Sequence, residues 1–359
     1  GRPPGRSPPR RRAIPNDTSL TYAASGVDID AKMSAVARAK EAIRSTFTPG
    51  VVGDVGGFGG LFRPDFRGMQ DPLLVASADG VGTKIRVAIA SDVHGTVGQD
   101  IVNHCVNDIL VQGARPLFFL DYVATGKMRR DVIAEVIGGV AAACRENGCA
   151  LLGGETAEMP GMYADGDYDL AGTIVGVVDR PKLLDGSRVA EGDLLLGLPS
   201  SGLHTNGYSL ARMLFFERLG LGPHDTVPEL GTTVAGALLA VHRSYLTPLL
   251  PLVDEGLLSA MSHVTGGGFP DNLPRVLPEG LRAVVMPGAW EWPALFRFVR
   301  EKGSVPEGEM LRVFNCGVGM VLFVAPERAA EVRRRLVAAG ETVLDVGRVE
   351  KGPRGVRFA

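Results

Sequence analysis

Acidic, basic and glycine residues occur together in the stretch "ADGVGTK", which follows an apolar run. Its Lys84 follows Thr83, whereas a Walker A loop places lysine before serine or threonine. The carboxylate of Asp79 would repel a phosphate group unless a divalent cation lay between them. The stretch therefore favours a corner where Asp79 binds Mg²⁺, while Lys84 and the amides of Gly80 and Gly82 bind phosphate. A plain turn rich in Asp and Gly is the alternative interpretation.

Two further acids are candidates for the same cation, since Mg²⁺ usually takes one or two carboxylates plus phosphate oxygens. In "HCVNDILVQG", Asn107 and Asp108 interrupt an apolar helical pattern, so they are either a solvated edge or ligands that face a cleft. In "ALLGGETAEMPGMY", a glycine pair breaks a buried strand and Glu155 follows. Acids directly after a strand lie where α/β proteins bind ligands, although an ordinary acidic loop has the same composition. Asp108 and Glu155 are therefore candidates to join Asp79 as metal ligands.

The second half of the chain has two polar clusters next to glycines. "LPSSGLHTNGYSL" leads from a strand into a helix start, where backbone N–H groups, hydroxyls and an imidazole can bind an anion. "SHVTGGGFPDN" places His263 before three successive glycines, whose entropic cost implies close approach by a ligand or another backbone. A lone histidine is more often structural, and no Ser-His-Asp spacing or G-x-S-x-G elbow supports a hydrolase. The residues of these clusters are candidate ligand-binding residues: Ser201, His204, Thr205, Asn206, Gly266, Gly267, Gly268 and Asn272.

The glycine-rich stretch "VGGFGGLF" runs from Val55 to Phe62. It fails as a dinucleotide-binding fingerprint because no strong strand precedes it and no helix start follows it. We predict a flexible lid over a ligand, and a plain linker is the alternative.

These segments need strands and helices to position them, and both halves of the chain alternate strand-like and helix-like patterns with short connections. That alternation predicts an α/β or α+β fold. In the second half, Pro248 and Pro251 must break or kink a long apolar helical stretch. The elements expected in the first half are helices at 29–47, 97–114 and 128–148 and strands at 73–78, 115–124, 150–155 and 170–179.

The stretch "DRPKLLD" is the expected boundary between two domains, a number that suits a chain of 359 residues. The first residues are rich in Arg and Pro without an apolar face, so they are expected to be a disordered tail. A transit peptide is the alternative, which the prolines oppose. The predicted divisions are the tail at 1–18, an N-terminal ATP- and metal-binding and dimerisation domain at 19–180, and a C-terminal domain with substrate-binding loops at 181–359.

Composition excludes several classes of protein. Hydrophobic residues make up 45% of the chain and charged residues 22%, with a net charge of -2, so neither nucleic acid nor an acidic membrane surface is an expected partner. No apolar run reaches the roughly 20 residues that span a bilayer. The four cysteines have no metal-ligand spacing, which favours a reduced, cytoplasmic protein without disulfides.

Taken together, the motifs resemble the phosphoribosylformylglycinamidine cyclo-ligase (aminoimidazole ribonucleotide synthetase) family of de novo purine synthesis. The resemblance runs from about Ser19 to about Val349. "DGVGTK" alone is typical of a wider superfamily that includes selenophosphate synthetase and thiamine-phosphate kinase. The segments specific to the cyclo-ligases are "FFLDYVATGK", "GGETAEMPGMY" and "HVTGGGF", and "SLTYAASGVDID", "GGFGGLF", "SSGLHTNGYSL" and "FNCGVGM" agree with them.

The resemblance implies a ring closure that depends on ATP and Mg²⁺, often with K⁺. ATP phosphorylates the formamide oxygen of formylglycinamidine ribonucleotide, an amidine nitrogen attacks the activated carbon, and ADP and phosphate are released. It also implies a two-domain purine-synthetase-type ATP-binding fold. The N-terminal sheets of a homodimer pair into a barrel, and a mixed C-terminal sheet with helices closes a cleft between the domains.

The resemblance further assigns roles to individual positions. It gives His263, Lys84 and Asp79 catalytic roles and makes Asp79, Asp108 and Glu155 the metal ligands. The expected nucleotide ligands are Lys40, Gly57, Gly59, Gly80, Gly82, Thr83, Lys84 and Asn107. The resemblance also makes the candidate ligand-binding residues of the two polar clusters in the second half substrate ligands.

One departure from the family pattern is visible. Ala23 and Ala24 follow Tyr22 where the family often has a Lys-Asp or Arg-Asp pair, so an N-terminal contact is in doubt.

Two rival functions remain. A selenophosphate synthetase would need a reactive Cys in its N-terminal segment, yet Cys105 is the first cysteine here. A non-catalytic nucleotide-binding protein would tolerate loss of the acids, and all three are present.

Overall fold

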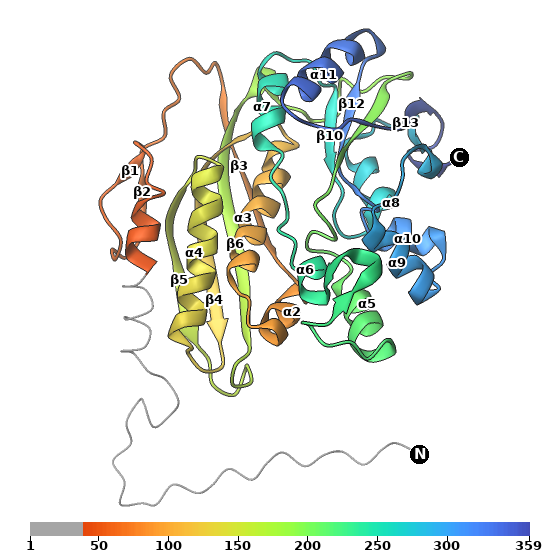
Figure 1. Cartoon of the computed structure of the whole chain (residues 1–359). Helices are drawn as coiled ribbons and strands as arrows, with labels where there is room; N and C mark the ends of the chain where they lie inside the picture. Colours follow the sequence, from red (N-terminus) through yellow and green to blue (C-terminus); the bar gives the residue numbers. More distant parts are fainter. Residues whose placement is uncertain (1–38) are drawn as a thin grey trace, which may run out of the picture.

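The computed structural model describes residues 39–359, which form two β-sheets with associated helices (Figure 1). The predicted α/β (α+β) class is confirmed. The tail predicted at 1–18, most of the helix predicted at 29–47 and the pair Ala23 and Ala24 lie outside the described residues. Within the described part, residues 39–44 are helical.

The N-terminal sheet has four strands in the order β3-β6-β4-β5. β6 is antiparallel to both of its neighbours, whereas β4 and β5 are parallel because α4 connects them. The glycine pair predicted to break β5 does not end it, because Gly153 and Gly154 stay paired with β4 across a register shift. The elements are β3 (Pro72–Gly80), β4 (Arg115–Thr125), β5 (Ala150–Glu158), β6 (Tyr168–Asp179), α2 (Lys84–Ser91), α3 (Gly95–Leu110) and α4 (Arg130–Glu146).

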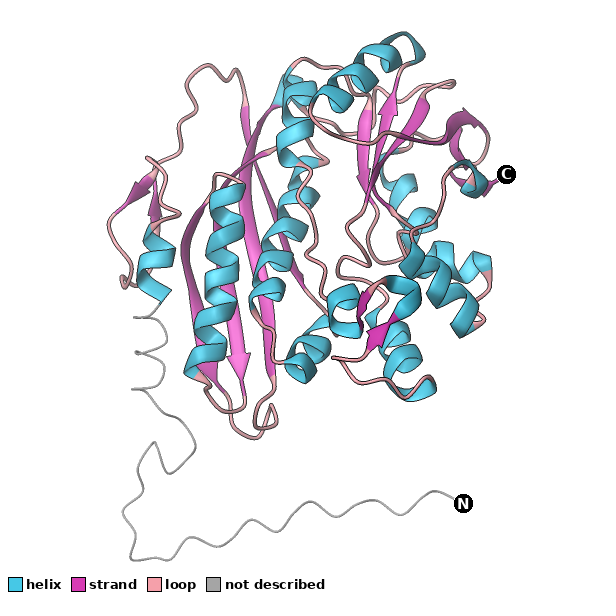
Figure 2. Cartoon of the chain, viewed as in Figure 1, coloured by secondary structure: helices cyan, strands magenta, loops and turns pink. Residues whose placement is uncertain are grey.

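Helices α3 and α4 lie side by side on one face of this sheet (Figure 2). Their backbones touch where two glycines meet: a Cβ on Gly98 would lie 2.1 Å from the carbonyl oxygen of Val136, and one on Gly139 would lie 2.0 Å from that of Gly95. No side chain fits at such a distance, so the glycine pair sets the separation of the two helices. Ile101, Val106 and the other apolar residues of α3 fill the core against the sheet.

The C-terminal sheet has six strands in the order β10-β12-β7-β13-β11-β14. All neighbouring strands are antiparallel except β11 and β14, which are parallel. β12 is buried along its whole length, so this sheet is covered on both sides of its central strands. The strands are β7 (Leu194–Pro199), β10 (Ala260–His263), β11 (Leu281–Val285), β12 (Val318–Val324), β13 (Leu344–Lys351) and β14 (Gly355–Phe358).

The long apolar stretch predicted to kink at its prolines is two short helices with an extended segment, 239–245, between them. The break precedes Pro248, which lies in the first turn of α7, while Pro251 lies inside that helix. The helices of this half are α5 (Tyr208–Arg212), continued by a π-helix at Met213–Arg218, α6 (Val234–Leu238), α7 (Leu246–Asp254), α8 (Gly268–Asn272), α9 (Ala294–Gly303), α10 (Glu307–Val313) and α11 (Pro326–Ala338).

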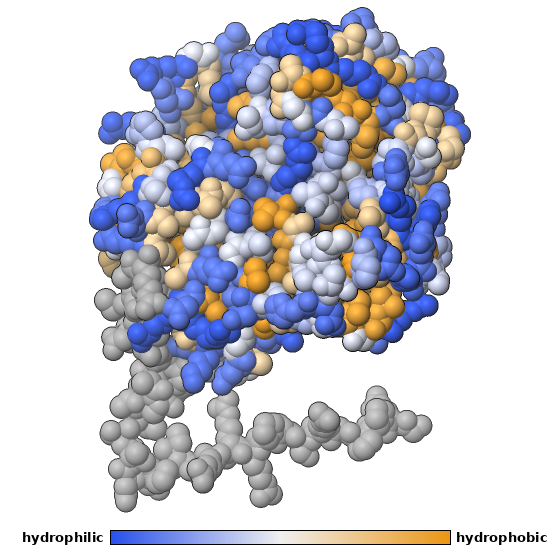
Figure 3. Space-filling model, in the orientation of Figure 1, coloured by the Kyte–Doolittle hydropathy of each residue, from blue (hydrophilic) through white to orange (hydrophobic). Residues whose placement is uncertain are grey.

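Two hairpins of two-residue strands complete the described elements: β1 (Val51–Val52) with β2 (Leu61–Phe62), and β8 (Thr226–Val227) with β9 (Thr232–Thr233). The first hairpin carries the glycine-rich stretch as its loop. Polar and apolar residues are interspersed on the face of the molecule that carries α3 and α4 (Figure 3). None of the helices within residues 39–359 is long and apolar enough to cross a membrane.

Candidate active site

A cavity of about 840 Å³ lies where the end of β3 and helix α3 meet loops of the C-terminal half. This volume suits a nucleotide-sized ligand. Nine of the residues predicted from the sequence line its wall: Asp79, Gly80, Gly82, Asp108, Thr205, Asn206, His263, Gly266 and Asn272.

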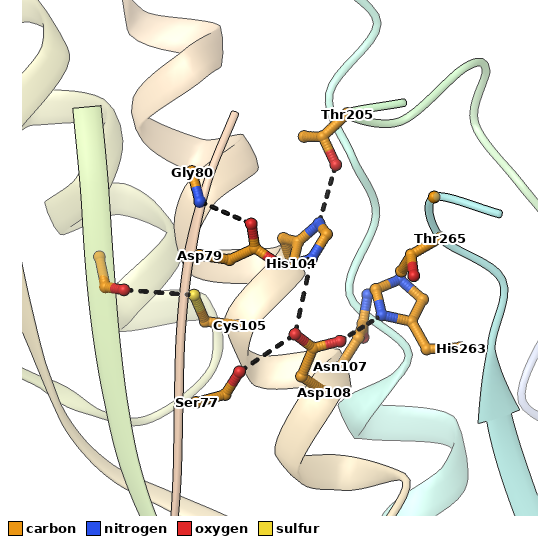
Figure 4. A network of polar contacts seen from close by, with 12 residues as sticks. Ser77, Asp79, Gly80, His104, Cys105, Asn107, Asp108, Thr205, His263 and Thr265 are labelled. Atoms are coloured by element: carbon orange, nitrogen blue, oxygen red, sulfur yellow. Dashed lines mark hydrogen bonds and ion pairs between the residues drawn. The ribbon is translucent and has the colours of Figure 1, made fainter. Parts of the chain in front are cut away.

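A chain of carboxylates and imidazoles forms the polar wall of this cavity (Figure 4). His104 Nε2 lies 2.8 Å from Asp79 Oδ2 and 3.5 Å from Asp108 Oδ2. His263 Nδ1 lies 2.8 Å from Asp108 Oδ1, and Ser77 Oγ donates to Asp108 Oδ2 at 3.1 Å. The two acids, which come from different elements, are thus held next to each other by histidines.

The histidines keep both acids ionised. Burial opposes ionisation of both acids, but it is outweighed at Asp79 by the hydrogen bond and charge of His104 and at Asp108 by those of His263 together with the charge of His104, so the pKa of each carboxyl is lowered. Burial likewise opposes protonation of His104, yet the neighbouring carboxylates raise its pKa. For His263 burial prevails, and its pKa is lowered.

Helix α3 positions this wall through a stripe of polar residues four apart, Asp100, His104 and Asp108, which face the same side of the helix. The extended segment 239–245 lies along the stripe. The backbone N–H of His242 donates to Asp100 Oδ1 at 2.7 Å, and the amides of neighbouring asparagines bind the carbonyls of the same segment. Several backbone groups of the segment are therefore satisfied by α3 side chains instead of by a helix or sheet of its own.

Lys84 requires a correction, because it does not reach the cavity. Its side chain is fully buried, and Nζ lies 2.8 Å from Asp100 Oδ2. The same Nζ donates to the carbonyl oxygens of His204 at 3.1 Å and Ala240 at 2.8 Å. Its ammonium joins the first turn of α2 to the loops of the C-terminal half, so its contacts are structural.

Three other predicted ligands also have internal partners. Asn107 is buried: its Oδ1 accepts from the N–H of Tyr245 and its Nδ2 donates to the carbonyl of Arg243, both at 2.9 Å. The ring of His204 stacks on that of His242 with centroids 3.9 Å apart, and burial lowers the pKa of His204 well below its usual value. Ser201 Oγ donates to the carbonyl of Val241. None of the three lines the cavity.

The predicted three-acid cluster needs a second correction, since Glu155 does not join Asp79 and Asp108 in this chain. Glu155 lies on β5 and Asp79 on β3, which are opposite edges of the sheet. Glu155 lines a separate cavity of about 830 Å³, together with Gly57 and Gly59 of the glycine-rich loop. That loop forms the wall of this second cavity, and Phe58 at its tip is fully exposed.

The remaining predicted ligands lie outside both cavities. Lys40 is on the helical segment 39–44, and its charge adds a small part to the lowering of the Asp54 pKa, which comes chiefly from the hydrogen bond of Arg44. Thr83 is exposed, 3.4 Å from the hydroxyl of Ser209. Gly267 and Gly268 have positive φ values, and a Cβ on Gly268 would lie 2.0 Å from the carbonyl oxygen of Leu311. Gly268 of this run is therefore needed for close backbone packing. Of the three glycines, Gly266 is the one that lines the cavity.

Sequence reasoning missed three residues of the site. His104 bridges the two acids, and its spacing of four residues from Asp108 on one helix was the signal that could have found it. His242 touches His263, with their Nε2 atoms 3.0 Å apart. Arg275 lines the cavity and brings a guanidinium where Lys84 was expected to supply the cation; no spacing in the sequence marks Arg275.

Comparison with known proteins identifies the family. The N-terminal domain model of AIR synthase related proteins matches residues 65–178, and the C-terminal domain model matches residues 190–359. A phosphoribosylformylglycinamidine cyclo-ligase of Desulfitobacterium hafniense (strain DSM 10664 / DCB-2) is 50% identical over 338 residues, which are 94% of this chain and 99% of the relative. This chain belongs to the cyclo-ligase family. The cyclo-ligase of Oleidesulfovibrio alaskensis is 49% identical, over 94% of this chain and 96% of that one.

Membership of the cyclo-ligase family makes this chain a ligase. Solved structures with the same two-domain fold include a thiamine-monophosphate kinase from Stenotrophomonas maltophilia, with a TM-score of 0.64 and 18% identity over 90% of this chain and 95% of that one. The hydrogenase maturation protein HypE in complex with ATP has a TM-score of 0.63 and 19% identity over 93% of each chain. The domain boundary predicted at 179–185 stays a prediction.

Proposed function

We propose that this cyclo-ligase converts formylglycinamidine ribonucleotide to 5-aminoimidazole ribonucleotide with ATP, in de novo purine synthesis. The observation that carries the proposal is the cavity that Asp79 and Asp108 line together with the loops of the C-terminal half predicted to bind the substrate. The names of relatives that are about half identical over nearly the whole chain support the same reaction. Four buried free thiols are consistent with a cytoplasmic enzyme.

The chemistry proceeds in two steps that balance. The formamide oxygen attacks the γ-phosphorus of ATP, ADP leaves, and the formyl carbon becomes electrophilic. The amidine nitrogen then attacks that carbon, one proton leaves the amidine nitrogen and one leaves the formamide nitrogen, and phosphate leaves with the former formamide oxygen. Neither step needs a protein nucleophile, so the enzyme contributes orientation and charge stabilisation.

The cavity wall fits these demands. Asp79 and Asp108 would hold Mg²⁺, which prefers carboxylate oxygens and would neutralise phosphate charge when bound. Arg275, at the same wall, can pair with a phosphate group. Thr205, Asn206 and Gly266 offer hydroxyl, amide and backbone groups to the ribonucleotide. His263, whose pKa is lowered by burial, is suited to accept a proton at the reacting centre. The K⁺ requirement stays a prediction.

We also propose that the chain acts as a homodimer through its N-terminal sheet. Helices α3 and α4 cover one face of that sheet, and Val75 and Val123 point into this core. The residues that precede them, Leu74 and Tyr122, point to the opposite face and are 64% and 40% exposed. An open apolar sheet face supports pairing with a second sheet, as in the expected barrel.

A coupled assay tests the function. Purified chain, ATP, Mg²⁺ and formylglycinamidine ribonucleotide should release ADP, and release should stop when the ribonucleotide is omitted. Asp79→Asn should lower turnover by about 10²- to 10³-fold, whereas Asp165→Asn, in an exposed turn, should leave it unchanged. ATP binding without ribonucleotide-dependent turnover would contradict the proposal.

A further inference from the structure

The cavity wall carries a set of atoms that can ligate a metal ion through nitrogen as well as oxygen. Single ligand atoms of His104, Asp108 and His263 all lie within 4.8 Å of one another, and Asp79 Oδ2 lies 2.8 Å from His104 Nε2. The two imidazoles are almost fully buried, while the carboxylates open to the cavity. The buried nitrogen atoms of the two histidines thus lie close to the accessible oxygen atoms of Asp79 and Asp108.

The spacing of these atoms suits a transition-metal ion. Metal–ligand bonds of about 2.0–2.2 Å in a tetrahedral site place neighbouring ligand atoms about 3.4 Å apart. The contacts of His104 with the two acids are 2.8 and 3.5 Å, and that of His263 with Asp108 is 2.8 Å. The ligand atoms of His104, Asp108 and His263 all lie within 4.8 Å of one another, so an ion between them requires side-chain movements of about 1 Å.

The contact of His104 Nδ1 with Thr205 leaves His104 Nε2 available to bind a metal ion. His104 Nδ1 lies 2.8 Å from the hydroxyl oxygen of Thr205. When Nδ1–H donates to that hydroxyl, the lone pair of Nε2 points at the carboxylates. Ligating histidines usually have this arrangement, with the second ring nitrogen donating to an oxygen that fixes the ring.

The hydrogen bonds around His263 lead to the same result. Asn107 Oδ1 accepts from a backbone N–H, so its Nδ2 is the donor to His242 Nε2 at 3.2 Å. His242 Nε2 is then an acceptor, and the Nε2–H of His263 donates to it at 3.0 Å. The other ring nitrogen of His263, Nδ1, then faces Asp108 Oδ1 at 2.8 Å with a proton or a cation between the two atoms. Two acceptors at this distance repel unless a cation or proton lies between them.

We propose that His104, His263, Asp79 and Asp108 bind one divalent first-row transition-metal ion, of the Zn²⁺ or Co²⁺ kind. Imidazole nitrogen favours these ions over Mg²⁺, which prefers oxygen ligands and retains its waters. The ion takes the place expected for Mg²⁺ at the two carboxylates, and Nδ1 of His263 becomes a ligand in place of a proton acceptor. Its use in ring closure rests on the proposed function, but its binding does not.

The test measures metal binding without nucleotide or substrate. The chain is stripped with a chelator and titrated with Co²⁺, whose visible absorption reports nitrogen ligation and low coordination number. We expect one Co²⁺ per chain, displaced by Zn²⁺ but not by about a 100-fold excess of Mg²⁺. His104→Ala and His263→Ala should abolish this absorption, and the control His224→Ala, at an exposed histidine, should retain it.

Graded variants and spectroscopy complete the test. Thr205→Val removes only the outer partner of His104 and should weaken Co²⁺ binding about 10- to 100-fold. X-ray absorption of the Zn²⁺-loaded wild-type chain should show imidazole scattering, which decides the matter even if a histidine variant fails to fold. Absence of a one-equivalent Co²⁺ signal, its persistence in His104→Ala, or equal competition by Mg²⁺ would overturn the site.

The two proposals fail separately. Co²⁺ binding without turnover of formylglycinamidine ribonucleotide contradicts the function and leaves the metal site. Turnover with Mg²⁺ by a chain that binds no Co²⁺ contradicts the metal site and leaves the function.

Discussion

The two ends of the polar stripe on α3 carry the same residue type in opposite circumstances. Asp100 is fully buried and paired with Lys84, and its other oxygen accepts a backbone N–H. Asp108, two turns further on, is a quarter exposed at the cavity and is held by His263 and Ser77. One acid joins the two halves of the chain, and the other faces the place where a ligand binds.

The difference lies in what each acid can still bind. The partners of Asp100 are supplied by the protein and water cannot reach them, so its charge serves stability and the arrangement of the loops. The partners of Asp108 are imidazoles at a cavity, which an incoming cation can replace. An acidic residue on a helix therefore becomes a candidate ligand through its exposure to a cavity and not through its type.

The largest effect should come from the buried end. Lys84→Met leaves Asp100 charged and unpaired, so we expect the free energy of unfolding to fall by about 3–5 kcal/mol, measured by urea denaturation. Lys84→Met/Asp100→Asn removes both charges but keeps an acceptor for the N–H of His242, and should recover at least about 1 kcal/mol. Turnover of this double variant should stay within about tenfold of wild type. A stable double variant with no turnover would show that Lys84 binds phosphate.

The exposed end should respond in the opposite sense. Asp108→Asn removes the negative charge at the cavity and should lower kcat about 10²- to 10³-fold in the coupled assay. The free energy of unfolding should change by no more than about 1 kcal/mol, because the amide can replace several of the same hydrogen bonds. If Asp108→Asn unfolds the chain as readily as Asp100→Asn, the contrast between the two ends disappears.

Asp121, which is not part of the polar stripe on α3, tests whether burial controls the ionisation of an acid elsewhere in the chain. Burial raises the pKa of Asp121, beneath the glycine-rich loop, to about 7, with a smaller effect of Glu155. The unfolded chain releases this proton from about pH 4, whereas the folded chain retains it until about pH 7, so stability falls as the pH rises through that window. Asp121→Asn should therefore raise the free energy of unfolding at pH 8 by about 1–2 kcal/mol and change little at pH 4. Equal effects at both pH values would contradict this.

The smallest effect concerns the support of Asp108. Ser77→Ala deletes one hydrogen bond, at 3.1 Å, to the carboxylate and should lower kcat about 2- to 10-fold. Ser77→Thr keeps the hydroxyl and serves as the matched control. A loss above about 100-fold in the alanine variant would place Ser77 in direct contact with the substrate.

Sequence patterns predicted the elements better than the site. Apolar periodicity located α3, α4 and the strands of the N-terminal sheet, because each of these elements buries one face. The same periodicity failed at 239–245, where the pattern continues but the backbone is extended along α3. Its backbone groups are satisfied by Asp100, Asn103 and Asn107, which lie more than 130 residues away in the sequence.

The site shows the same limit. Asp79 and Asp108 were recognisable as acids at element ends, and the structure brings them together. Glu155 had the same local signature, yet strand order places it at the other edge of the sheet. Strand order depends on long-range pairing that no local pattern specifies. The loop that contains Lys84 resembles a phosphate-binding loop, so its lysine was expected at the cavity. Lys84 instead begins α2, and its side chain is buried.

The contact of Gly98 with α4 has a consequence for how the enzyme can vary. The separation of α3 from α4, and with it the position of the helix that carries His104 and Asp108, is set where neither Gly98 nor Gly139 has a side chain. A methyl group at Gly98 or Gly139 would act as a wedge and displace the whole stripe, although neither position is near the cavity. The position of the site residues on α3 thus depends on two glycines that have no reactive or ligand-binding side chain.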